Sequence, residues 1–293
     1  MSTVSIVGTG RMGSAMARAI ARAGFDIVLY NRTRARADAL AAELGARVVD
    51  SPREAAAAAG VTIAMLSDDI ACASTFDGPD GLLAGARPGS VLVDMSTVRP
   101  TTLAGFDGRA RAIGVGLLDS PVSGSVSLAE AGSLTLMVGG ETADLERARP
   151  VLEAVSKTII HLGPIGTGAA MKLAVNTLIF GINGALAEGL VLAERNGIDR
   201  ALAYDVFSTS AAGAPFVAYK RAAFVDPEAT PVAFSLALAE KDLRLIEQLA
   251  ETSDTAIPQA TLNLERIRVT ARSAGEDADF SMVASHLREE GRR

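Results

Sequence analysis

A chain of 293 residues is long enough for two domains, and its formal charge of −6 argues against a surface that binds nucleic-acid phosphates. Hydrophobic residues make up 49% of the chain but aromatic residues only 4%, so the interior must be built from small aliphatic side chains, as in helices packed on parallel strands. The single cysteine, Cys72, can form no internal disulfide.

The sequence also bears on location. A strand pattern begins at Val4, which leaves no room for a signal peptide. The apolar run over residues 55–66 is shorter than the ~20 residues that span a bilayer. We therefore expect a cytoplasmic protein with no membrane and no nucleic-acid partner.

Short β-branched runs alternate with Ala-rich helical stretches through the first half of the chain, which predicts βαβ units and a doubly wound parallel sheet. The predicted strands are Val4–Val7, Ile27–Tyr30, Arg47–Val49, Val61–Leu66, Val91–Asp94, Gly116–Asp119, Leu134–Val138 and Thr158–His161. After Gly168 the pattern is helical almost throughout, beginning with a long apolar helix over residues 169–195. We predict an α/β domain over residues 1–163 and an all-α domain over residues 164–293.

A glycine motif directly follows the first predicted strand. Gly8, Gly10 and Gly13 form GxGxxG, and a helix is predicted to begin at Arg11. The first glycine permits a tight turn, the second lets the backbone approach a pyrophosphate, and the third lets the helix pack on the strand. We therefore predict a Rossmann-type dinucleotide site to which Arg11 and Met12 also contribute. The alternative is a Gly-rich turn with a purely structural role.

The residues at the end of the second predicted strand indicate whether the site prefers NAD or NADP. A site for NAD usually has Asp or Glu there, which binds the ribose hydroxyls and repels a 2′-phosphate. Asn31, Arg32 and Thr33 stand at this place, and all three can bind the phosphate, Arg32 by charge. We expect NADP (NADPH) as the cofactor. In the alternative, Arg32 is a solvated surface residue like Arg34 and Arg36.

Two further strand ends are expected to line the nicotinamide pocket, because ligands gather beyond the carboxyl ends of parallel strands. Met65, Leu66 and Ser67 lie at the end of the fourth predicted strand, and Ser96 and Thr97 follow the fifth. The alternative for Ser96 or Thr97 is that it caps the next helix.

Lys172 stands within the long apolar helix, and Asn176 follows it by one helical turn, so both project from the same face. Such a lysine either extends its ammonium group to water or is held partly desolvated. In the second case it can exchange a proton with a substrate hydroxyl while hydride moves to or from a nicotinamide.

Four motifs together are more specific than the glycine motif alone: residues 8–13, 119–125, 163–176 and 241–243. Through them the chain resembles the β-hydroxyacid dehydrogenase family, which includes 3-hydroxyisobutyrate dehydrogenases, tartronate semialdehyde reductases and glyoxylate/succinic semialdehyde reductases. The resemblance extends over essentially the whole chain. Ser125 stands where many members have a second glycine and Ser120 where many have alanine, which is similar to the glyoxylate/succinic semialdehyde reductase branch.

The resemblance implies roles for five residues. Lys172 matches the general acid/base, Asn176 an asparagine that holds the substrate, and Ser123 and Gly124 the residues that bind the substrate carboxylate. Lys241 matches a lysine that reaches towards the nicotinamide and the substrate, whereas locally it reads as a surface residue paired with a neighbouring acid. The family also implies a C-terminal domain like that of 6-phosphogluconate dehydrogenase, and a homodimer or homotetramer.

We therefore expect an oxidoreductase that moves hydride between NADP(H) and a small β-hydroxyacid or aldehyde acid, of the 3-hydroxyisobutyrate, glyoxylate or semialdehyde type. One alternative is an imine reductase-like NADPH-dependent reductase, although imine reductases typically lack a lysine at the position of Lys172. The other is a noncatalytic dinucleotide-binding protein. Metal chemistry is not expected, because His161 and His286 are far apart in the sequence and lack ligand spacing.

Overall fold

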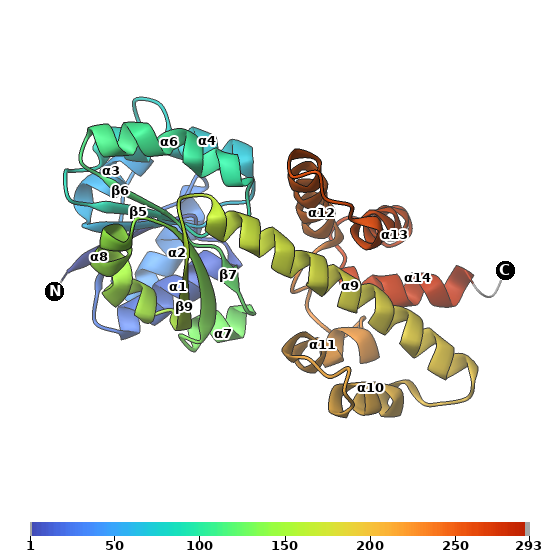
Figure 1. Cartoon of the computed structure of the whole chain (residues 1–293). Helices are drawn as coiled ribbons and strands as arrows, with labels where there is room; N and C mark the ends of the chain where they lie inside the picture. The colour runs from blue at the N-terminus through green and yellow to red at the C-terminus, as the bar shows by residue number, and fades with distance from the viewer. Residues whose placement is uncertain (1, 291–293) are drawn as a thin grey trace. The chain divides into compact units, whose positions relative to one another are not determined.

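The structure, a computed structural model, describes residues 2–290. The chain divides into two compact units, Met1–Lys172 and Leu173–Arg293. The division falls inside helix α9 (Thr167–Arg195), a single helix of 29 residues that Figure 1 draws as one continuous coil. The domain limit at residue 163, inferred from composition, stays a prediction.

The first unit is built on a nine-stranded sheet with the strand order β3-β2-β1-β4-β5-β6-β8-β7, with β9 beside β8. The strands from β1 to β6 pair in parallel, whereas β8 is antiparallel to β6 and β7. The order reverses at β1, and ligands bind at such a switch point, beyond the carboxyl ends of the strands. The strands are β1 Thr3–Val7, β2 Asp26–Tyr30, β3 Arg47–Val48, β4 Val61–Ala64, β5 Val91–Asp94, β6 Gly116–Asp119, β7 Val122–Ser123, β8 Leu134–Gly140 and β9 Ser156–Gly163.

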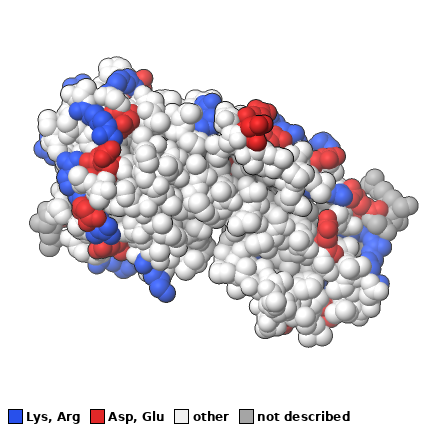
Figure 2. Space-filling model, viewed as in Figure 1, with Lys and Arg blue, Asp and Glu red and all other residues white. Residues whose placement is uncertain are grey.

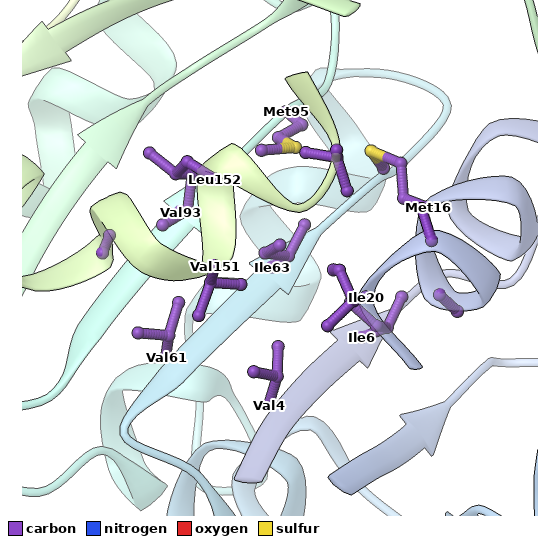
Figure 3. Packing of buried hydrophobic residues seen from close by; sticks show 14 of the residues in the cluster. Val4, Ile6, Met16, Ile20, Val61, Ile63, Val93, Met95, Val151 and Leu152 are labelled. Carbon is purple, nitrogen blue, oxygen red and sulfur yellow. The ribbon is translucent and has the colours of Figure 1, made fainter. Parts of the chain in front are cut away.

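Two apolar clusters cover the two faces of this sheet. Because side chains alternate along a strand, Ile6 faces one cluster and Val7 the other. In Figure 3, Ile6 and Ile63 on the strands lie beside Ile20 of α1. Burial on both faces explains why the strands read as nearly continuous apolar runs. The helices of this unit are α1 Arg11–Arg22, α2 Arg34–Leu44, α3 Pro52–Ala58, α4 Asp69–Phe76, α5 Leu82–Gly85, α6 Pro100–Ala112, α7 Val126–Glu130 and α8 Thr142–Glu153.

The second unit is helical in the residues that the structure describes, and its core is richer in aromatic rings. Phe280 lies at the centre and contacts Phe180, Phe216 and Phe234, with ring centroids 6.0, 5.8 and 5.4 Å apart. Besides the end of α9, its helices are α10 Arg200–Thr209, α11 Pro215–Val225, α12 Leu236–Thr252, α13 Pro258–Ala274, the short 3₁₀ helix η1 Phe280–Met282 and α14 Val283–Glu290.

The predicted fold class is confirmed, with differences at element ends. The strand predicted to reach Leu66 ends at Ala64, because the chain leaves the sheet at Met65 while still donating one bond to the carbonyl of Val7. The two-residue strand β7 was not predicted, since so short an element carries no alternating pattern of its own.

Helix α9 is long and apolar enough, by length and composition, to cross a membrane. The apolar run that was compared with a bilayer from the sequence was residues 55–66, not this longer helix. A core helix of a water-soluble protein meets the same criteria, and one such helix does not place the chain in a membrane. The expectation that no membrane partner exists stays a prediction.

Charged side chains of both signs are interleaved along the outer edge of the first unit in Figure 2. Ion pairs in this unit include Arg111 on α6 with Glu141, 3.1 Å apart, and Arg149 on α8 with Glu146, 2.6 Å apart. Neighbouring charges of opposite sign therefore compensate one another in these pairs.

Candidate active site

The glycine loop between β1 and α1 has the shape that a pyrophosphate requires. A Cβ atom on Gly8, whose φ is +98°, would lie 2.2 Å from the carbonyl oxygen of Met65, and one on Gly13 would lie 2.0 Å from that of Gly8. At Gly10, by contrast, a Cβ atom would meet nothing within 4 Å. Packing therefore demands glycine at two positions, and the third faces open space.

The N-terminus of α1 borders this open space. Its N-cap residue is Gly10, so no side chain caps the amides of the first turn. These amides and the positive end of the helix dipole can bind a dinucleotide pyrophosphate. Arg11 opens the helix and is exposed, whereas the half-buried Met12 packs on the core beneath the loop. The backbone N–H donors of this turn therefore fit the pyrophosphate of the predicted dinucleotide.

Asn31, after β2, has a structural task that the sequence did not reveal. Its Oδ1 accepts a hydrogen bond from the backbone N–H of Thr9 at 3.0 Å, and its Nδ2 donates to the carbonyl of Thr33 at 2.9 Å. The side chain therefore links the glycine loop to the turn after β2. Both ends of the amide are already bonded within the protein, which makes Asn31 a weaker candidate for a 2′-phosphate contact than predicted.

Arg32 and Thr33 are better placed for that contact. Both are exposed, and Thr33, the N-cap of α2, makes no capping bond with its side chain. Arg32 forms no ion pair with any residue that the structure describes, whereas Arg34 pairs with Asp38 at 3.4 Å and with a second carboxylate, that of Asp50.

The loops after β4 and β5 are joined by hydrogen bonds. The N–H of Leu66 donates to Ser96 Oγ at 2.8 Å, and Ser96 Oγ donates to Oδ1 of Asp94 at 2.6 Å. Helix α6 begins at Pro100 with Arg99 as its N-cap, so neither Ser96 nor the half-buried Thr97 caps it, and that alternative is wrong.

Ser67 extends the first of these loops to the surface. Its hydroxyl donates to Oδ2 of Asp68 at 2.7 Å. Asp68 in turn caps α4 by accepting from the N–H of Ala71 at 2.8 Å. Ser67 is exposed. The bond to Asp68 holds it beside the start of α4, at the carboxyl edge of the sheet.

The segment after β6 contains the predicted carboxylate-binding residues. Ser123 ends β7 and is half-buried, and Gly124 follows with a φ of +140°, where a Cβ atom would lie 2.8 Å from Leu134 Cδ2. Ser125 is the N-cap of α7 and accepts from the N–H of Leu128 at 3.3 Å. The serine that set this chain apart from many members of the family therefore caps a helix.

Asp119, at the end of β6, anchors the helix that carries Lys172. Its Oδ1 accepts from the N–H of Gly166 at 2.7 Å and its Oδ2 from the N–H of Ala169 at 2.6 Å. Burial raises the pKa of Asp119, although these amides favour the charged form. Asp119 is thus a structural anchor for the start of α9. Lys172 is half-buried and lies one turn after Ala169, so its backbone position is set from the carboxyl edge of the sheet.

Within the second unit, Asp242 brings together two of the predicted residues. Asn176 is 5% exposed and donates from Nδ2 to Asp242 Oδ2 at 2.7 Å, and Nζ of Lys241 lies 2.8 Å from Oδ1 of the same carboxylate. Sequence reasoning missed this role of Asp242, which is 2% exposed. The available signal was an acid within the apolar stripe of α12, between Ala239 and Leu243.

Comparison with known proteins identifies the chain. The family model described as the NAD binding domain of 6-phosphogluconate dehydrogenase matches residues 3–163, and that described as NAD-binding of NADP-dependent 3-hydroxyisobutyrate dehydrogenase matches residues 166–287. The chain belongs to the β-hydroxyacid dehydrogenase family. As a member of that family it is an oxidoreductase that uses a nicotinamide dinucleotide and acts on hydroxyacids.

Similar members of the family carry different names, one of which specifies NAD. Glyoxylate/succinic semialdehyde reductase 2, chloroplastic, from Arabidopsis thaliana is 35% identical over 98% of this chain and 80% of its own length. NAD-dependent L-serine dehydrogenase from Pseudomonas aeruginosa is 32% identical over 97% of both chains. The structure of Mycobacterium tuberculosis 3-hydroxyisobutyrate dehydrogenase with L-serine has a TM-score of 0.85 and 32% identity, and covers 98% of this chain and 99% of that one.

Proposed function

We propose that this dehydrogenase moves hydride between NADP(H) and a small β-hydroxyacid or aldehyde acid, with Lys172 as the general acid/base. The observation that carries the proposal is the anchoring of α9 by Asp119. It ties the helix that bears Lys172 to the edge of the sheet where a dinucleotide binds. A noncatalytic dinucleotide-binding protein would not need an amine at this place.

Bound NADPH supplies the hydride, and the chain supplies the proton and the placement of the substrate. In the reductive direction the Lys172 ammonium gives its proton to the carbonyl oxygen as the carbon is reduced, and in the oxidative direction the neutral amine takes the hydroxyl proton. The Ser123 hydroxyl and the backbone N–H of Gly124 bind the substrate carboxylate. Asn176, whose amide is oriented by Asp242, holds the substrate by hydrogen bonding.

Lys172→Ala tests the chemical role. We expect turnover to fall by about 10²-fold or more, because general acid–base catalysis is lost, while NADPH binding stays unchanged. Steady-state kinetics and fluorescence titration with NADPH measure the two effects separately. Lys157→Ala, on an exposed position of β9, is the matched control. Activity retained in Lys172→Ala would refute the assignment.

The substrate class is tested with a panel. Hydroxyacids are assayed for oxidation, and aldehyde acids, the matching aldehydes without a carboxylate and cyclic imines for reduction. If Ser123 and Gly124 bind a carboxylate, kcat/KM is highest for the acids. A preference for cyclic imines would instead support the imine reductase-like alternative.

Arg32→Ala tests the choice of NADP. The proposal rests on the exposed guanidinium of Arg32, which forms no ion pair with a described residue and lies beside a strand end that lacks a carboxylate. Loss of a charge-assisted contact to the 2′-phosphate should raise the KM for NADPH about tenfold and leave that for NADH nearly unchanged. Arg34→Ala, which removes an arginine already paired with Asp38, is the control. Equal effects on both dinucleotides would contradict the assignment.

We further propose a cytoplasmic homodimer or homotetramer without a membrane or nucleic-acid partner. Exposed aliphatic side chains support self-association, since Leu178 and Leu192 on α9 are each 68% exposed and Leu202 on α10 is 63% exposed. Light scattering after size exclusion measures the assembly, and a monomer at micromolar concentration would refute this part of the proposal.

A further inference from the structure

Asp94, the last residue of β5, is 1% exposed, and no cation among residues 2–290 compensates its charge. Among the described residues, the titratable groups that face it are Asp119 on β6 and Asp69 and Cys72 on α4. Its Oδ2 is buried without a hydrogen-bond partner in the part of the chain that the structure describes. A buried carboxylate in such surroundings destabilises the fold, whereas a neutral side chain would avoid the penalty. We therefore look for a role of Asp94 in function rather than in stability.

The other oxygen of Asp94 determines what Ser96 can do. A hydroxyl has one proton to donate and lone pairs to accept with. Ser96 Oγ donates that proton to Asp94 Oδ1 at 2.6 Å and is thereby left to accept the N–H of Leu66 at 2.8 Å. The carboxylate thus fixes the orientation of the Ser96 hydroxyl and, through it, the start of the turn after β4.

This turn lies directly against the glycine loop. The carbonyl oxygen of Met65 would be only 2.2 Å from a Cβ atom on Gly8, so the two backbones are in close contact. A shift of Leu66 moves Met65 and presses on the loop that binds the pyrophosphate. A continuous series of contacts therefore runs from Asp94 on β5 to the dinucleotide loop after β1.

We propose that Asp94 is a positioning residue for the dinucleotide, which acts through Ser96 to fix the turn after β4 against the glycine loop. The inference rests on the dinucleotide binding that the proposed function requires. It does not depend on the substrate or on the choice between NADP and NAD.

The test is a double-mutant cycle of Asp94→Ala and Ser96→Ala, read by the dissociation constant of NADPH or NADH, whichever the wild type binds more tightly. Fluorescence of the reduced nicotinamide reports binding without turnover. We expect Asp94→Ala to weaken binding about tenfold in the wild type, as for the loss of one charge-assisted hydrogen bond. In the Ser96→Ala background the same change should weaken binding less than about twofold, because the connecting hydroxyl is gone.

A matched control lies at the other end of the same strand. Ser90 is buried, and its hydroxyl donates to the carbonyl of Arg87 at 2.6 Å. Ser90→Ala removes a comparable bond away from the cofactor edge and should leave the dissociation constant unchanged. Hydrogen exchange at the Leu66 amide should accelerate in Asp94→Ala and not in Ser90→Ala.

Asp94→Asn takes the place of Asp94→Ala if the latter does not fold by circular dichroism. It keeps the volume and one acceptor oxygen, so we expect a loss of about threefold that disappears in the Ser96→Ala background. An undiminished effect without Ser96, or unchanged binding in every variant, would overturn the role of Asp94. Failure of the wild type to bind either dinucleotide would instead refute the proposed function itself.

Discussion

Each of the two units contains a buried carboxylate, and the surroundings of the two differ. Asp279 in the helical unit is surrounded by partners, whereas Asp94 in the α/β unit is the acid that we propose serves the cofactor site. In the helical unit, Asp279 lies 2.6 Å from Nζ of Lys220 and accepts the N–H groups of Ala233, Phe234 and Ser281. Burial works to raise the pKa of Asp279, but Lys220 and the amides outweigh it and hold that pKa below its usual range.

In the α/β unit, no described cation lies beside Asp94 to compensate its charge. Burial raises its pKa to about 7, the hydrogen bonds from Ser96 oppose the rise, and the charge of Asp119 on the neighbouring strand adds to it. Asp279 and its partners join α11 to the start of α12 and to η1, whereas Asp94 joins two loops at the cofactor edge. A buried acid with all its partners serves the fold, and one without them is a candidate for function.

The largest effect on stability is expected from removing Lys220, the cation that pairs with Asp279. Lys220→Met leaves Asp279 charged and unpaired in the core, which should lower the free energy of unfolding by about 3–5 kcal/mol. Urea denaturation followed by circular dichroism measures it. Arg221→Met removes the exposed neighbour, which pairs with Asp205 at the surface, and should change stability by less than about 1 kcal/mol. Adding Asp279→Asn to Lys220→Met should recover much of the loss, and no recovery would show that the ion pair is not the cause.

Ionisation of Asp94 should make the free energy of unfolding depend on pH. The pKa of Asp94 is higher in the folded than in the unfolded chain, so its contribution to stability is present below pH 4 and is lost as the pH rises to about 7. Relative to the wild type, Asp94→Asn should therefore gain up to about 4 kcal/mol of unfolding free energy between pH 4 and pH 8. Denaturant titrations at both pH values give the difference directly. A pH-independent difference between the two proteins would contradict a buried, titrating Asp94.

Asp242 tests whether a compensated acid can also serve the site, because it has partners and yet holds two predicted functional residues. In Asp242→Asn the charge that orients Asn176 and pairs with Lys241 is lost, so we expect kcat/KM to fall by about 10- to 100-fold, or ~1.5–3 kcal/mol. Glu240→Gln, on the same helix but paired with Arg244, is the control and should stay near wild-type activity. Loss of stability without loss of activity in folded Asp242→Asn would make this acid purely structural.

Features that depend only on residues close together in the chain could be predicted from the sequence. The strands of the first unit follow from runs of β-branched residues, and the glycine loop follows from spacing that packing alone demands at Gly8 and Gly13. Lys172 and Asn176 share a helix face because of their separation. These features need only the geometry of one element, which the order of residues contains.

Contacts between distant residues could not be predicted in the same way. The bonds from Asn176 to Asp242 and from Leu66 to Ser96 join residues far apart in the chain, and no periodicity specifies which polar groups pair. Ser125 shows a related limit. Its difference from many family members suggested the glyoxylate/succinic semialdehyde reductase branch, but the sequence did not reveal that its side chain caps α7.

The amide of Asn31 limits how the coenzyme preference of this enzyme could be redesigned. An engineer who wished to favour NADH would first replace the polar residues after β2 with an acid. At Asn31 that exchange would put an acceptor where Nδ2 now donates to the carbonyl of Thr33, and would loosen the glycine loop for either coenzyme. Substitutions at Arg32 and Thr33 leave this brace intact, so a library of variants would start there.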